Sequence, residues 1–96
     1  MDLYKTYVLC IKNLQINNNN NNNKITINDN NNNKLHFKCD YFTSLEEAKK
    51  KESLIKKYET TMKINRTTND FHIFEVFGPT DFHNIQVKHY LSFYNK

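Results

Sequence analysis

The sequence predicts an α+β domain in which an antiparallel sheet of four to five strands carries one long helix on one face, in the order β-β-β-α-β-β. Several short segments alternate apolar and polar residues, as strands do, and one longer segment has the apolar spacing of a helix. Most connections between these segments are short, which favours antiparallel neighbours. A chain of 96 residues fits one domain, so we assign residues 1–96 to a single unit.

The first predicted strand covers residues 4–12, YKTYVLCIK, which are rich in β-branched and aromatic types. Its apolar side chains fall on both faces, with Tyr7, Leu9 and Ile11 on one face and Val8 and Cys10 on the other. A strand that is apolar on both faces is typical of the middle of a sheet, so we expect this strand to be central.

Two further strands are predicted at residues 24–28, KITIN, and residues 34–42, KLHFKCDYF. The shorter one alternates Ile25 and Ile27 with polar neighbours. The longer one has a strict alternation that predicts a half-buried strand. Its expected inward-facing side chains are Leu35, Phe37, Cys39 and Tyr41.

An asparagine-rich insertion occupies residues 17–33 and contains the runs Asn17–Asn23 and Asn30–Asn33. Polar tracts of low complexity bury little apolar area, so we expect both runs to form disordered surface loops. Loops tolerate lengthening at low free-energy cost, which favours an expansion that the fold accommodates. The alternative is a self-associating, prion-like role for the asparagines.

The helix is predicted within residues 43–63, and either Thr43 or Ser44 can be its N-cap because each is followed three residues later by a glutamate. Four Glu-before-Lys pairs with a spacing of four residues predict a solvated outer face that carries salt bridges. The predicted apolar stripe comprises Leu45, Ala48, Leu54, Ile55, Tyr58 and Met62.

Residues 71–77, FHIFEVF, predict a second strand with apolar residues on both faces, and a turn at Gly78–Asp81 follows it. The tail at residues 84–96 is ambiguous between strand and helix. We favour a strand because Ile85, Val87, Leu91 and Phe93 alternate, whereas on a helix they scatter around the axis.

Composition argues against several functional classes. The formal net charge is +4, but one Arg among fourteen basic residues argues against sequence-specific nucleic-acid recognition. No apolar run is long enough to span a membrane, and the N-terminal residues do not resemble a secretory leader. We therefore expect a cytoplasmic or nuclear protein whose two cysteines stay reduced.

Candidate chemical groups are few. Two cysteines and four histidines are present, but their spacings match no recurrent zinc site, and a single glycine leaves no phosphate-binding loop. The glutamates lie mostly on the helix beside lysines rather than in pairs suited to acid–base catalysis. We expect no enzyme activity, no metal and no cofactor.

One helix covers only one face of a sheet, so the second apolar face needs another cover. A second copy, another protein, the tail folded back as a helix, or stacked bases would serve. We therefore predict a non-catalytic interaction module that binds a protein partner or another copy of itself through this face. The alternatives are a weak, non-specific nucleic-acid binder and a protein without a defined biochemical activity. The predicted contact residues are Tyr4, Val8, Phe74, Val76, Tyr90 and Tyr94.

Overall fold

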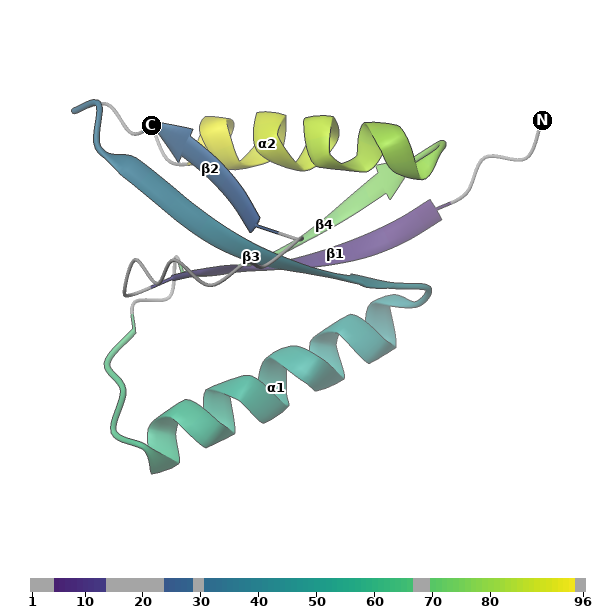
Figure 1. Ribbon diagram of the computed structural model, residues 1–96. Helices are drawn as coiled ribbons and strands as arrows, with labels where there is room; N and C mark the ends of the chain where they lie inside the picture. The colour runs from purple at the N-terminus through teal and green to yellow at the C-terminus, as the bar shows by residue number, and fades with distance from the viewer. Residues whose placement is uncertain (1–4, 14–23, 29–30, 67–69, 95–96) are drawn as a thin grey trace.

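The computed structural model describes residues 5–13, 24–28, 31–66 and 70–94. Figure 1 shows a four-stranded antiparallel sheet between two helices, in the spatial order β2-β3-β1-β4. The elements are β1 (Lys5–Lys12), β2 (Lys24–Asn28), β3 (Lys34–Phe42), α1 (Leu45–Thr61), β4 (Phe71–Phe77) and α2 (His83–Tyr94). A short 3₁₀ turn at Thr80–Phe82 connects β4 to α2.

The central position of β1 is confirmed, because β1 pairs with β3 on one side and with β4 on the other. Leu9 lies opposite Asp40 of β3 and Ile73 of β4. The alternation predicted for β3 is also confirmed, since Phe37 and Cys39 are buried and Lys38 is exposed. These strands follow the two-residue period of the sequence.

The prediction of a fifth strand in the tail is wrong, and so is the prediction of only one helix. Residues 83–94 form α2, which lies across the sheet face opposite α1 (Figure 1). Its inward side chains are His83, Val87 and Leu91, spaced one helical turn apart. Ile85 and Phe93 are each 64% exposed. The alternation that suggested a strand therefore included two apolar residues that face solvent.

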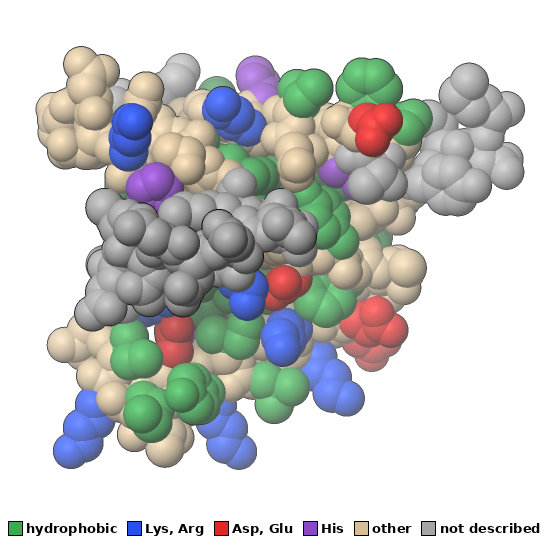
Figure 2. All heavy atoms as spheres, viewed as in Figure 1, with side chains coloured by type: hydrophobic (Ala, Val, Ile, Leu, Met, Phe, Trp, Pro, Cys, Tyr) green, Lys and Arg blue, Asp and Glu red, His purple; other side chains and the backbone are tan. Residues whose placement is uncertain are grey.

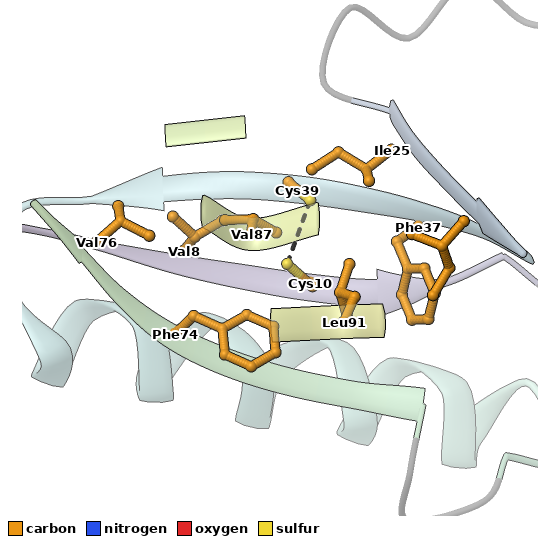
Figure 3. Packing of buried hydrophobic residues seen from close by; sticks show 10 residues of the cluster. Val8, Cys10, Ile25, Phe37, Cys39, Phe74, Val76, Val87 and Leu91 are labelled. Atoms are coloured by element: carbon orange, nitrogen blue, oxygen red, sulfur yellow. Dashed lines mark hydrogen bonds between the residues drawn. The ribbon is translucent and has the colours of Figure 1, made fainter. Parts of the chain in front are cut away.

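The main hydrophobic core lies between α2 and the sheet (Figure 3). All four strands contribute to it, and Val87 and Leu91 of α2 cover it on the helix side. Full burial of a Leu or Val side chain stabilises a fold by about 1.5–3 kcal/mol. The strand residues of this core are Val8, Cys10, Ile25, Ile27, Phe37, Cys39, Phe74 and Val76.

A smaller core lies between α1 and the other face of the sheet. Leu9, Ile11 and Phe71 are buried there, with Phe42, Ile55 and Ile73 packed around them. Ser44 is the N-cap of α1, and its side chain accepts a hydrogen bond from the Glu47 N–H at 3.1 Å. Of the four predicted Glu–Lys pairs on α1, Glu52–Lys56 lies within salt-bridge distance, at 3.7 Å, and the other three do not.

The asparagine-rich insertion lies partly outside the described residues, which exclude Asn17–Asn23. The described end of the second run, Asn31–Asn33, forms the turn between β2 and β3. Asn32 has a φ of 62°, a left-handed conformation that asparagine adopts more readily than most residues. These asparagines therefore close a hairpin.

In the part of the chain that the structure describes, neither helix has the length and apolar character required to cross a bilayer.

Candidate interaction site

The sheet face that was predicted to be uncovered is covered by α2. Val8 and Val76 are fully buried beneath this helix, and Phe74 is only 8% exposed. Tyr90 packs on the same core from α2, with its ring stacked on Phe74 at 5.3 Å between centroids. These residues are brought together as predicted, but inside one chain, so they offer no contact surface to a partner while α2 is in place.

The two other predicted contact residues are Tyr94, whose side chain is not described, and Tyr4. Tyr94 is the last residue of α2, and Tyr4 lies outside the described residues. The predicted site therefore corresponds to the main core, and the tail folded back as a helix is its cover.

An apolar surface that the sequence placed in the core is instead exposed on α1. Leu54, Tyr58 and Met62 are 56%, 62% and 57% exposed, and their spacing of four residues aligns them along the helix. We call these three residues the α1 stripe. Ala48, Ile55 and Glu59 face the sheet in its place. The helix is therefore rotated about its axis relative to the orientation expected from hydrophobicity.

An ionic cluster at the end of α1 explains this rotation. The Nε of Arg66 lies 2.5 Å from Glu59 Oε1, and its Nη1 donates a hydrogen bond to the carbonyl oxygen of Lys12. Arg66 also lies 3.9 Å from Asp70 and rests against the Phe71 ring at 5.2 Å. Because buried carboxylates require a partner, this cluster holds Glu59 inward and turns the α1 stripe outward.

A cleft of about 770 Å³ runs between α1 and the β3 side of the sheet. Ile11 and Phe42 line its sheet side, Ile55 and Tyr58 line its helix side, and Arg66 also lines it. We call this cleft the α1–β3 groove. Tyr58 belongs to both the groove and the α1 stripe, so the two surfaces meet at this residue.

Charged side chains border the groove. Lys38 and Asp40 project from β3 and Lys51 projects from α1. None of the three has an ion-pair partner within 4.0 Å among the described residues, whereas Glu59 and Arg66 neutralise each other. Figure 2 shows apolar, basic and acidic side chains together on the half of the molecule that contains α1. The border thus carries two lysines and one aspartate, which leaves an excess of one positive charge.

A smaller pocket of about 220 Å³ lies where β3 meets α2, next to Tyr41 and His83. The Tyr41 hydroxyl donates a hydrogen bond to the Asn84 side chain, and His83 Nε2 donates to the Gly78 carbonyl oxygen at 2.8 Å. Burial raises the pKa of Tyr41 to about 12, with a further contribution from the nearby cysteines. These contacts fix the start of α2 against β3.

Cys10 and Cys39 lie opposite each other on β1 and β3, with their sulfur atoms 3.2 Å apart (Figure 3). Both are fully buried. The hydrogen bond to Cys39, together with burial, raises the pKa of Cys10 above its usual range. A buried thiol that stays protonated is a poor nucleophile. Within the described ranges, no three His, Cys, Asp or Glu side chains cluster closely enough to hold a metal ion.

Comparisons with protein-family models, with characterised proteins and with solved structures found no match for this chain.

Sequence reasoning missed the α1 stripe and the groove because it ranked helix faces by hydrophobicity. A partial signal was present. Arg66 is the single arginine of the chain, it follows Glu59 by seven residues, and it precedes Asp70 by four residues. A lone guanidinium between two carboxylates is suited to a buried cluster.

Proposed function

We propose that the chain is a non-catalytic interaction module whose α1–β3 groove and α1 stripe bind an acidic amphipathic segment of a partner protein. The observation that carries this proposal is that the exposed Leu54, Tyr58 and Met62 lie beside an open cleft, which Tyr58 itself lines. The equally exposed Ile85 and Phe93 of α2 line neither this cleft nor the smaller pocket. Exposed apolar surface beside a groove is typical of sites that receive an amphipathic helix.

The charges around the groove select the chemistry of the partner. Lys38 and Lys51 have no acidic partner within the described structure, and Asp40 offsets one of them. The whole chain carries a net charge of +4. A segment with Leu or Phe on one face and Glu or Asp at its margins would satisfy both features.

The non-catalytic part of the proposal has separate support. The two cysteines, which are the strongest nucleophiles in the sequence, are fully buried, and Cys10 is held protonated. Neither cysteine lines the groove. The groove residues are suited to contact and charge complementarity rather than to proton transfer or covalent chemistry.

The experiment uses two designed peptides that differ only in charge. Both have Leu at positions spaced three and four residues apart, one has Glu and the other has Lys at the remaining positions. Backbone amide shifts of the protein are measured by NMR during titration. We expect the Glu peptide to shift the amides of β3 and α1 around Phe42, Ile55 and Tyr58, and the Lys peptide to shift them much less. Shifts confined to α2, or no shifts, would contradict the proposal.

Two variants sharpen the test. Tyr58→Ala should weaken binding of the Glu peptide about tenfold or more, since a central aromatic contact typically contributes at least 1–2 kcal/mol. The matched control is Phe93→Ala, an exposed aromatic residue on α2, which should leave binding unchanged. Both residues are more than half exposed, so stability should change by less than about 1 kcal/mol in either variant.

A second candidate function is weak, non-specific nucleic-acid binding. It is favoured by the exposed lysines Lys49, Lys50 and Lys57 of α1, which have no acidic partner within 4.0 Å among the described residues. It is disfavoured by the engagement of Arg66 in the internal cluster. Affinity for a single-stranded oligonucleotide that falls steeply with salt would favour this function, whereas apolar docking in the groove should be less sensitive to salt.

A further inference from the structure

β4 is an edge strand that lacks the usual protection. It pairs with β1 along Phe71–Phe77, and no other described strand pairs with its outer side. Natural edge strands are commonly shielded by lysine, proline or a bulge. The β4 sequence FHIFEVF contains neither residue, its register with β1 is continuous, and Glu75 is its sole formal charge.

The hydrogen-bond pattern shows which main-chain groups point outward. Directly opposed residues in antiparallel strands alternate between hydrogen-bonded and non-hydrogen-bonded pairs. The Asn13 N–H donates to the His36 carbonyl oxygen at 2.8 Å, so odd-numbered residues of β1 exchange bonds with β3 and even-numbered residues exchange bonds with β4. It follows that the odd-numbered residues of β4 turn their N–H and C=O groups away from β1.

The side chain of Gln86 supports the same conclusion independently. The Phe77 N–H donates to Gln86 Oε1 at 3.1 Å, and the Phe77 carbonyl oxygen accepts from Gln86 Nε2 at 2.6 Å. Gln86 thus bonds Phe77 as a neighbouring strand would, on the outer side of β4. In the described part of the chain, no such group bonds the main chain of Ile73 or Glu75.

We infer that β4 pairs with β4 of a second copy in antiparallel orientation, about a twofold axis at Ile73. In this register Phe71 lies opposite Glu75 of the second copy, and Ile73 lies opposite its own equivalent. All of these residues have outward main-chain groups, so the pairing forms about six hydrogen bonds. The two sheets then join into one continuous sheet with closed twofold symmetry.

The charge of Glu75 and the Gln86 side chain select this register over its neighbours. In each copy Glu75 pairs with Lys5, at 2.8 Å between Oε1 and Nζ, and in the proposed register it lies opposite the apolar Phe71 of the other copy. A register centred on Glu75 would place two carboxylates opposite each other, which is unfavourable. It would also require the main-chain groups of Phe77, which Gln86 already occupies.

This inference does not depend on the proposed function, because β4 lies at the opposite edge of the sheet from the β3 side that forms the groove. A three-residue strand pairing buries less area than a standard interface, so we expect a reversible dimer at concentrations of about 10–100 μM.

The test combines sedimentation of the full chain over a range of concentrations with amide hydrogen exchange measured by NMR. We expect the mass to double as concentration rises. The Ile73 and Glu75 amides should then exchange at least about tenfold more slowly. Exchange at Phe77 should not depend on concentration, because its N–H is bonded within one chain. A chain that remains monomeric throughout this range overturns the inference.

Three variants locate the interface. Glu75→Pro removes an outward N–H and is compatible with an edge strand. Glu75→Lys retains the strand but puts an unpaired lysine on the edge beside Lys5, the kind of charge that shields natural edge strands. Both should weaken dimerisation at least about tenfold. Tyr58→Lys disrupts the groove and should leave the dimer intact. If Tyr58→Lys abolishes the dimer and both Glu75 variants retain it, the copies associate through α1 and the inference is wrong.

Discussion

Replacement of Leu91 by alanine tests whether α2 is the cover of the sheet. Leu91 is fully buried in the main core, beside Phe74 and the paired cysteines (Figure 3). The matched control is Ile85→Ala, which removes the same number of carbon atoms from the same helix at a position that is 64% exposed.

The expected loss for Leu91→Ala follows from its burial. The substitution removes three carbon atoms, worth roughly 2.4 kcal/mol at about 0.8 kcal/mol each, and leaves a cavity that adds to this cost. We expect a loss of about 3 kcal/mol in the free energy of unfolding. For a domain of 96 residues this corresponds to a fall in Tm of about 15 °C. Ile85→Ala should cost less than about 1 kcal/mol.

Urea denaturation followed by circular dichroism measures both losses. The dependence of the free energy on urea concentration should stay the same in the two variants, which shows that the same surface is exposed on unfolding. If Leu91→Ala costs no more than Ile85→Ala, α2 does not cover the sheet in solution. The sheet face opposite α1 would then be exposed, as the sequence predicted.

Three other predictions concern the buried polar groups. Arg66→Met leaves buried carboxylates without their cation and should lower the free energy of unfolding, measured in urea, by about 3 kcal/mol. Adding Glu59→Gln to this variant should recover part of the loss. If Arg66→Met is as stable as the parent, the cluster does not have the proposed role. The folded protein favours the neutral form of Tyr41, whose pKa is raised to about 12, so this stabilisation is present below pH 10 and is lost as the pH rises towards 12. Tyrosinate absorbance should therefore show a late step that Tyr41→Phe removes, and an unchanged titration would refute the assignment. Cys10 and Cys39 should react with Ellman's reagent at least about 100-fold faster in urea than in the native state, and rapid native labelling would show that the pair is accessible.

The strands and α1 were predictable because their signals are local. The alternation in β3 and the cap at Ser44 each depend on residues within a few positions of one another. The tail was not predictable in this way. On α2 the inward face includes His83, while Ile85 and Phe93 face solvent, so a hydrophobicity pattern favours the wrong period.

The site was less predictable than the fold because its geometry depends on contacts between distant residues. The orientation of α1 is set by the Glu59–Arg66 pair and by the Lys12 carbonyl oxygen, and that main-chain contact has no sequence signature. If this contact is not known, the apolar pattern of the helix predicts that Leu54 and Tyr58 are buried. The outward turn of these two residues is therefore a tertiary effect.

The middle position of β1 has a consequence for how the chain acquires its structure. The residues that flank Leu9 in the sheet, Asp40 and Ile73, are synthesised much later than β1 itself. Until β3 and β4 have both left the ribosome, the apolar side chains on the two faces of β1 stay at least partly exposed to water. Native pairing between such distant segments is slow, and exposed strands attract other nascent chains. The pairing of β1 with both neighbours should therefore be completed only after β4 has been synthesised, and an early β3–β1 pair should protect β1 until then.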